Sequence, residues 1–169
     1  MRVPDFKHDF KDYQKFDIGA MGEFDVSVLI EEYAGKPTAK RLCPEWRGGY
    51  YYAAKSKADS TGTAPLGLLY VSRWSNADKA AEFAGIYASA LKKRYKKTEE
   101  LGASPAEAPT ERDADSKSKL LSGRHVWSTE DGTVIIEEHG DTVLVSESLD
   151  ATTTATLEKE VFGAGSAAQ

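Results

Sequence analysis

The residue types that most often carry chemistry are few and scattered in this chain. Its three histidines, His8, His125 and His139, stand far apart, and no two of them have the spacing of metal ligands. The single cysteine, Cys43, directly precedes Pro44 and has no second cysteine or histidine near it in the sequence. We therefore interpret Cys43 as a structural thiol and not as a nucleophile.

One acidic turn is the best candidate for a cation site. Glu137, Glu138 and His139 are followed by Asp141, and carboxylate and imidazole groups are ligands for divalent metals. Carboxylates around a hairpin turn are more often simply solvated, so we predict no metal site here. Nucleotide-binding glycine loops and the Gly-x-Ser-x-Gly motif are missing. The sequence thus predicts no catalytic residue, no metal and no cofactor, and favours a protein that is not an enzyme.

Aromatic residues cluster around one predicted hairpin, with a further tryptophan on a later strand. Tyr50 and Tyr52 would share one face of a strand, and Tyr51 would take the other. Because one face must pack against helices, most of these rings are predicted to be core. The alternative is an exposed aromatic surface that holds a sugar, a peptide or a partner helix, with arginines as polar anchors. The candidate ligand-binding residues are Trp46, Arg47, Tyr50, Tyr52, Arg73, Trp74 and Trp127.

Apolar spacing predicts the helices that must position these residues. Val26, Leu29, Ile30 and Tyr33 recur at helical intervals, which predicts a helix over residues 22–33. Pro37 suits the first turn of a short helical segment that ends near residue 42. Ser75 is placed to cap a long helix that continues to residue 95, and Asp150 is placed to cap a last helix that ends near residue 162.

Five strands are expected between these helices. Residues 50–54 and 66–74 form the first hairpin, and residues 124–128, 133–138 and 142–147 form three short strands joined by compact turns. This order predicts an α+β fold with one mostly antiparallel sheet of about five strands and helices packed on it, similar to an α/β/α sandwich. We expect residues 22–162 to form this single domain.

Three segments are expected to lie outside the regular framework. Residues 1–21 mix charges and aromatic rings without a period, which indicates an N-terminal arm that lies against the domain. Residues 98–119 are polar and contain two prolines, which is typical of a mobile loop. Residues 163–169 are predicted to form a flexible tail.

Composition limits the classes of partner. The chain has 169 residues and a net charge of −5, whereas a protein that binds nucleic acid normally carries a basic excess. The one dense basic run, residues 92–97, falls at the end of a predicted helix, where cations complement the helix dipole.

No apolar stretch approaches the length of a membrane span, so we predict no membrane insertion. The charged beginning lacks the apolar core of a signal peptide, and we interpret the chain as part of a longer protein.

Short motifs resemble a family of uncharacterised bacterial and archaeal surface proteins. Residues 21–24 (Met-Gly-Glu-Phe) open an apolar helix, residues 44–51 contain Trp-Arg-Gly-Gly-Tyr-Tyr, and Trp74 leads a helix that contains Phe83. The family has a similar order over residues 18–162, downstream of a segment similar to zinc metallopeptidases. The Asp-Arg pair that follows the family's Gly-Gly is missing here, so no catalytic residue is carried over. The order of strands and helices also resembles the PsbP-type fold.

The resemblance implies a non-catalytic accessory or interaction domain of an exported bacterial protein, located in the periplasm or at the cell surface. A cytoplasmic location stays open, because the chain contains no signal peptide. Two other functions stay open: a module that binds a small molecule or peptide on the aromatic surface, and an enzyme with a dispersed site. The expected partner is another protein or the rest of a larger chain. A second copy of the chain that pairs by strand addition at a tyrosine-rich edge is a further expectation.

Overall fold

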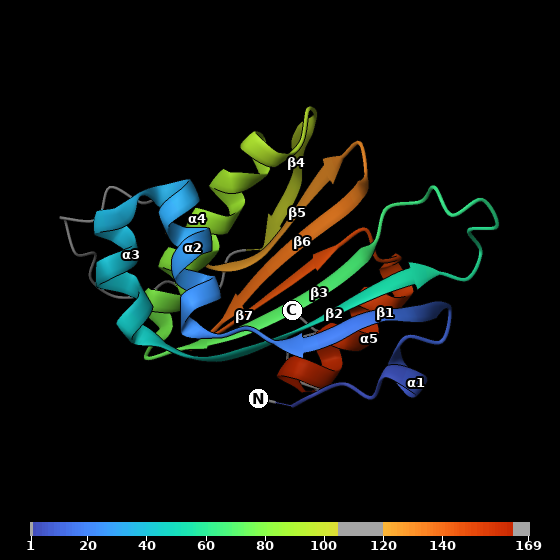
Figure 1. Ribbon diagram of the computed structural model, residues 1–169, viewed down its shortest axis with the longest axis horizontal. Coiled ribbons are helices and arrows are strands. Elements are labelled where there is room, and N and C mark those ends of the chain that lie inside the picture. Colours follow the sequence, from blue (N-terminus) through green and yellow to red (C-terminus); the bar gives the residue numbers. More distant parts are fainter. Residues whose placement is uncertain (1, 105–119, 164–169) are drawn as a thin grey trace.

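The computed structural model describes residues 2–104 and 120–163. Within these residues, one seven-stranded sheet forms the centre of the fold, and every neighbouring pair of strands is antiparallel (Figure 1). The strands lie in the order β1-β2-β3-β7-β6-β5-β4. Their bounds are β1 (Tyr13–Ala20), β2 (Trp46–Ser56), β3 (Gly67–Trp74), β4 (Thr98–Ser104), β5 (Gly123–Thr129), β6 (Gly132–His139) and β7 (Thr142–Glu147).

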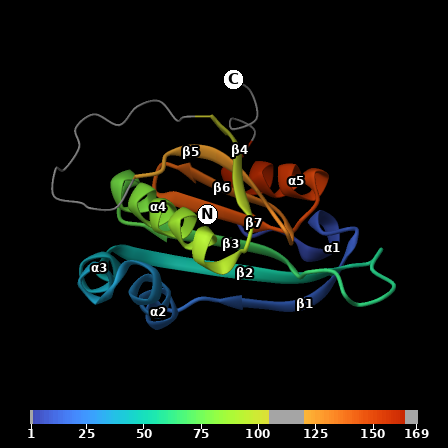
Figure 2. The same cartoon turned by 90° about the horizontal axis from the view of Figure 1, so that it is seen from above.

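Helices cover both faces of this sheet (Figures 1 and 2). They are α1 (Phe6–Asp9), α2 (Glu23–Ala34), α3 (Lys36–Leu42), α4 (Ala77–Arg94) and α5 (Ala151–Phe162), with a single 3₁₀ turn η1 (Cys43–Glu45). Side chains from α2, α3 and α4 form one core with one face of the sheet. Residues near α1 and from α5 form a second core on the opposite face. The predicted α+β class and single mostly antiparallel sheet are confirmed.

The prediction of about five strands is wrong, because the two edge strands were not recognised. In β1 only Tyr13 is buried, and in β4 every residue after Thr98 is exposed. Neither strand therefore shows the alternation of apolar and polar residues by which a half-buried strand is recognised. Both strands also contain a bulge, at Phe16 and at Leu101, which further breaks the period of two.

Residues 1–21, which we predicted to be an arm, are mostly built into the sheet. β1 pairs along its whole length with β2, from Tyr13 opposite Ser56 to Ala20 opposite Tyr50. The segment before β1 does lie against the domain. Its Pro4 carbonyl accepts a hydrogen bond of 2.7 Å from the buried Tyr52 hydroxyl.

The predicted loop over residues 98–119 begins instead with a strand. Residues 98–104 form β4, which pairs with β5. The rest of that predicted loop, residues 105–119, lies outside the described residues, as do residues 164–169 of the predicted tail. Gly163 ends α5 with a φ of 83°, a conformation that favours glycine.

The predicted helices agree with the structure to within two residues at most ends. The Asp150 side chain caps α5 by accepting from the backbone N–H groups of Thr152 and Thr153, as expected. The cap of α4 differs, since Asn76 and not Ser75 accepts from the backbone of Lys79. Asparagine and serine are about equally good caps, so propensity did not distinguish the two neighbours.

A close approach at Gly67 fixes how the second core meets the sheet. Gly67 begins β3 and is buried, and a Cβ at this position would overlap Leu149 Cδ2 and lie 3.4 Å from Tyr13 Cε1. Because Leu149 is itself buried, it has little room to withdraw. The sheet therefore needs glycine here to admit the leucine that leads into α5.

We predict that Gly67→Ala lowers the free energy of unfolding by about 1–3 kcal/mol, the usual cost of adding a methyl group to a packed core. Urea denaturation measures the change. Gly102→Ala is the matched control, because a Cβ at Gly102 would meet no atom within 4 Å. An equal effect of the two substitutions would contradict the packing argument.

Candidate functional site

The structure divides the predicted aromatic residues between the two faces of the sheet. Tyr50 and Tyr52 lie in the core beneath α1, where Tyr52 stacks on Phe10 with ring centres 5.4 Å apart. Trp74 and Trp127 lie in the opposite core, under α4. All four side chains are buried, so the interpretation of these rings as core is confirmed.

The remaining three candidates are near the first hairpin but do not form a shared surface with the four buried rings. Trp46 is partly buried against the α4 core. Arg47 is exposed and donates to the carbonyls of its neighbours Pro44 and Trp46. Arg73 forms an ion pair with Asp141, with Nε and Oδ2 2.7 Å apart. The seven residues are therefore not brought together as one ligand site.

The side chains of the acidic turn also do not point toward one common position. Glu137 and Glu138 are both buried and, as neighbours in β6, point to opposite faces of the sheet. His139 stacks on Phe162 of α5, and Asp141 pairs with Arg73. Among the described residues, no group of three histidine, cysteine or carboxylate side chains is arranged to hold a metal ion.

A buried carboxylate network joins the end of α4 to the sheet. Glu147, at the end of β7, receives two hydrogen bonds of 2.7 Å from the guanidinium of Arg94. The hydroxyls of Tyr87 and Tyr95 each donate to the same carboxylate at 2.6 Å. Sequence reasoning missed this network, because Tyr87, Arg94 and Tyr95 precede Glu147 by 52 to 60 residues along the chain.

The environment of this network fixes its charges. Burial raises the pKa of Tyr87 well above its ordinary value, and the Glu147 carboxylate adds to the shift. Burial is the largest single influence on Arg94 and opposes its charge, but the hydrogen bonds that Arg94 donates to Glu147, together with the charge of Glu147 and the Tyr87 hydroxyl, keep the Arg94 pKa above its usual range. Every polar group of the network therefore has a partner, which is the behaviour of a structural ion pair.

A second buried carboxylate connects two helices. Glu82 of α4 is 2% exposed, and its Oε2 accepts a hydrogen bond of 2.8 Å from Arg41 Nη1 of α3. The hydrogen bonds that Arg41 donates to Glu82 raise the pKa of the Arg41 guanidinium, against the smaller effect of burial. This pair holds α3 against α4, since α3 is otherwise buried only at Ala39 and Leu42.

The titration of the Glu138 carboxylate is moved close to neutral pH. Burial raises its pKa from 4.5 to about 7, against the opposing hydrogen bonds from the Gly123 amide and the Ser122 hydroxyl. Asp78, at the start of α4, adds repulsion that raises the pKa further. A protonated Glu138 is thus part of the folded state at mildly acid pH.

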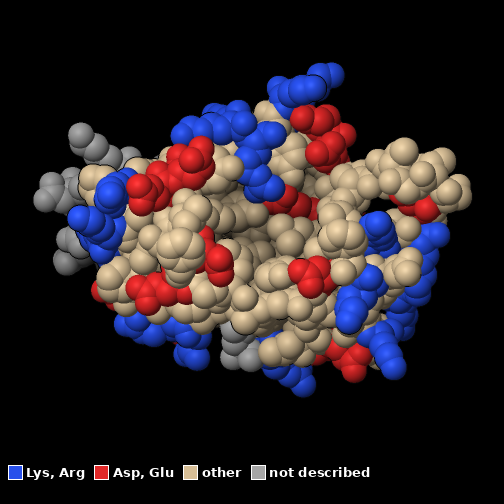
Figure 3. Space-filling model, in the orientation of Figure 1, with Lys and Arg blue, Asp and Glu red and all other residues tan. Residues whose placement is uncertain are grey.

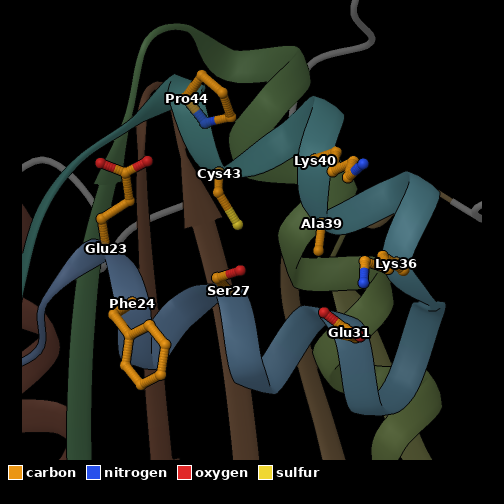
Figure 4. Close-up of a pocket in the computed structure, with 9 residues that line it drawn as sticks. All are labelled: Glu23, Phe24, Ser27, Glu31, Lys36, Ala39, Lys40, Cys43 and Pro44. Atoms are coloured by element: carbon orange, nitrogen blue, oxygen red, sulfur yellow. The ribbon is translucent and has the colours of Figure 1, made fainter.

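An open cleft lies between α2 and α3 (Figure 4). Gly35, with a φ of 86°, ends α2 and begins α3, and this tight connection places the two helices side by side. The cleft has a volume of about 550 Å³. Its lining residues are Glu23, Phe24, Ser27, Glu31, Lys36, Ala39, Lys40, Cys43 and Pro44.

The two walls of the cleft carry opposite charges. Glu23 and Glu31 stand on the α2 wall, and Lys36 and Lys40 stand on the α3 wall. All four side chains belong to exposed residues, and none of them forms an ion pair within 4 Å with another residue that the structure describes. The charges thus remain available to a molecule that enters the cleft.

The thiol of Cys43 lies at the inner end of this cleft and points toward the Ser27 hydroxyl (Figure 4). Burial raises the pKa of Cys43, and the carboxylate of Glu23 adds to the increase, while the hydrogen bond to Ser27 opposes it. A thiol with a raised pKa is a poor nucleophile. This environment supports the interpretation of Cys43 as a structural residue.

The outer face of α2 exposes large apolar side chains beside the cleft. Phe24 is 78% exposed and Val28, one turn further along, is 53% exposed. The inner face of the same helix carries Val26 and Ile30, which are fully buried. The apolar period over residues 22–33 predicts only the inner face of this helix. Phe24 and Val28 also have the spacing of one helical face, and this signal was missed.

Comparison with family models, with curated proteins and with solved structures finds no match for this chain. No helix among the described residues combines the length and the apolar character needed to cross a membrane. The assignment of a candidate site therefore rests on the geometry of the described residues alone.

We predict that Arg94→Met lowers the free energy of unfolding by about 3–5 kcal/mol, because it leaves the buried Glu147 carboxylate without its cation. The double variant Arg94→Met/Glu147→Leu should be less destabilised than the sum of the two single variants. A double-mutant cycle by urea denaturation measures this coupling, with the exposed Arg47→Met as the control that should change little. Additive single effects would show that the network is not an energetic unit.

We also predict that Glu138 makes stability fall as the pH rises. Its folded-state pKa lies above 4.5, so its contribution is fully present below that pH and is lost as the pH passes through about 7. The test compares the unfolding free energies of the wild type and Glu138→Gln from about pH 5 to pH 8. Their difference should change with pH in favour of Glu138→Gln at the alkaline end, and a constant difference would refute the assignment.

Proposed function

We propose that this chain is a non-catalytic interaction domain that docks a protein partner on the surface formed by α2 and α3. The observation that carries the proposal is the apolar pair Phe24 and Val28, exposed beside a cleft with one acidic and one basic wall. An exposed apolar stripe bordered by charges is typical of a recognition surface, where the apolar groups supply affinity and the charges fix orientation.

The chemistry of the rest of the molecule supports this proposal. Glu147 and Glu82 are held by arginines in structural ion pairs, and the Cys43 thiol has a raised pKa. None of these groups has the arrangement of a nucleophile beside a base. A protein partner remains the economical explanation for the exposed apolar residues of α2. The proposal that the domain belongs to an exported bacterial protein, in the periplasm or at the cell surface, is supported by the motif resemblance alone.

A second candidate function is the binding of a small molecule on the face shown in Figure 3. That face is hollowed near its centre, over the sheet beside α2. Tyr33, Tyr51 and Tyr95 are partly buried against the α4 core and are the candidate aromatic contacts for such a molecule. This function would use a different set of rings from the aromatic residues named in the sequence, since four of those are buried.

We predict that helical peptides selected from a displayed library of amphipathic helices bind the α2–α3 surface of the full chain. Phe24→Ser should weaken their binding at least about tenfold, because an apolar anchor at the centre of an interface contributes over 1.4 kcal/mol. Leu101→Ser is the matched control, because Leu101 is 61% exposed but lies on β4. Chemical-shift mapping locates the bound peptide.

Two results would count against the proposal. Selected peptides that bind Phe24→Ser as well as the wild type would place the recognition surface elsewhere. A chain that yields no peptide ligand of α2–α3, but binds small aromatic molecules at Tyr33, Tyr51 or Tyr95, would favour the second candidate.

A further inference from the structure

We propose that the partner on the α2–α3 surface is a second copy of this chain, and that the two copies exchange Phe24 side chains across a two-fold axis. This inference rests on the proposed function and names its partner. A two-fold interface brings the same surface of both copies together, so the surface must be complementary to itself. The α2–α3 surface meets this requirement in charge and in shape.

The charges of the two helices are fully segregated. α2 carries Glu23, Asp25, Glu31 and Glu32 and no lysine or arginine, whereas α3 carries Lys36, Lys40 and Arg41 and no acidic residue. The net charges are therefore −4 and +3 over these two helices. When two copies meet antiparallel, the acidic α2 of each faces the basic α3 of the other.

Internal contacts account for only part of these charges. Asp25 accepts from the Gly22 amide at the start of α2, and Arg41 pairs with Glu82. Glu23 and Glu31 on one wall, and Lys36 and Lys40 on the other, are the four that line the cleft. Each would gain an opposite charge from the second copy, and the reciprocal arrangement forms every such pair twice.

The apolar groups fit the same arrangement. Phe24 stands at the border of the cleft and turns its ring away from the cleft interior (Figure 4). The cleft volume of about 550 Å³ is within the range of sites that enclose a small ligand, and thus exceeds what one benzyl group needs. In the dimer, Phe24 of each copy enters the cleft of the other, and Val28 is covered beside it.

Strand addition, the alternative route to a dimer, is disfavoured by both edges of the sheet. β1 has a bulge at Phe16, and β4 has a bulge at Leu101. Bulges twist an edge and interrupt the row of backbone groups that a second strand would pair with. The α2–α3 surface has no such obstruction.

The experiment is sedimentation velocity of the full chain over about 1–200 µM, a range that covers weak and moderate dimers. The wild type should be a dimer at the highest concentrations, and Phe24→Ser should raise the dissociation constant of the dimer at least about tenfold. Ile18→Ser on the β1 edge is the control for strand addition and should leave the dimer unchanged. Circular dichroism verifies that each variant is folded.

Charge exchange gives the sharper test. Glu23→Lys/Glu31→Lys makes both walls basic, and Lys36→Glu/Lys40→Glu makes both walls acidic, so each variant alone should be a monomer through repulsion. An equimolar mixture of the two should form a heterodimer. Phe24→Ser introduced into both variants should abolish that heterodimer, which separates docking in the cleft from general attraction between opposite charges.

The outcomes distinguish this inference from the proposed function. A wild type that stays monomeric, but binds selected peptides at α2–α3, overturns the homodimer and leaves the interaction domain standing. A dimer that is lost with Ile18→Ser and unaffected by Phe24→Ser assigns the contact to the β1 edge and overturns the inference. A monomer without any ligand at α2–α3 overturns both proposals.

Discussion

The burial of α4 against the sheet is the constraint on which the rest of the structure depends. Ten residues of this helix are buried, including the charged Glu82, because β3, β6, β7 and α2 all pack against it. A helix enclosed in this way must satisfy its own charges internally. Arg41 of α3 accordingly forms an ion pair with Glu82, and Glu147 of β7 forms an ion pair with Arg94 at the end of the helix. The position of α3, and with it the cleft, follows from this requirement.

The central part of the fold was predictable because its elements are half buried or fully buried. α2, α4, α5 and the three central strands carry apolar residues at the spacing that packing demands, and the Asp150 cap of α5 is visible in the sequence. β1 and β4 were not predictable by the same argument, since Phe16 and Ile18 in β1 and Leu101 in β4 are exposed. What places these edge strands is backbone pairing with β2 and β5, which leaves almost no trace in side-chain pattern.

The candidate site was less predictable than the fold, for a related reason. Sequence reasoning selected rings by their size and grouping, yet a tyrosine or tryptophan on a strand is as useful to a core as to a ligand, and Tyr52, Trp74 and Trp127 serve the core. The spacing of Phe24 and Val28 was visible but was absorbed into one helical pattern. Only the structure shows that α2 has two apolar faces and that α3 covers neither Phe24 nor Val28.

The exposed face of α2 contrasts with the well-packed interior of the molecule. The buried Glu82 and Glu147 carboxylates are each paired with an arginine, the central strands are covered on both faces, and both edge strands contain a bulge. Phe24, which is 78% exposed, contributes little to the stability of the isolated fold, since the favourable free energy of an apolar side chain comes from its removal from water. Burial of Phe24 against another molecule would make its apolar side chain favourable. The segregation of acidic charge on α2 and basic charge on α3 then limits what that contact can be, because the surface opposite must present the same two charges in reverse order.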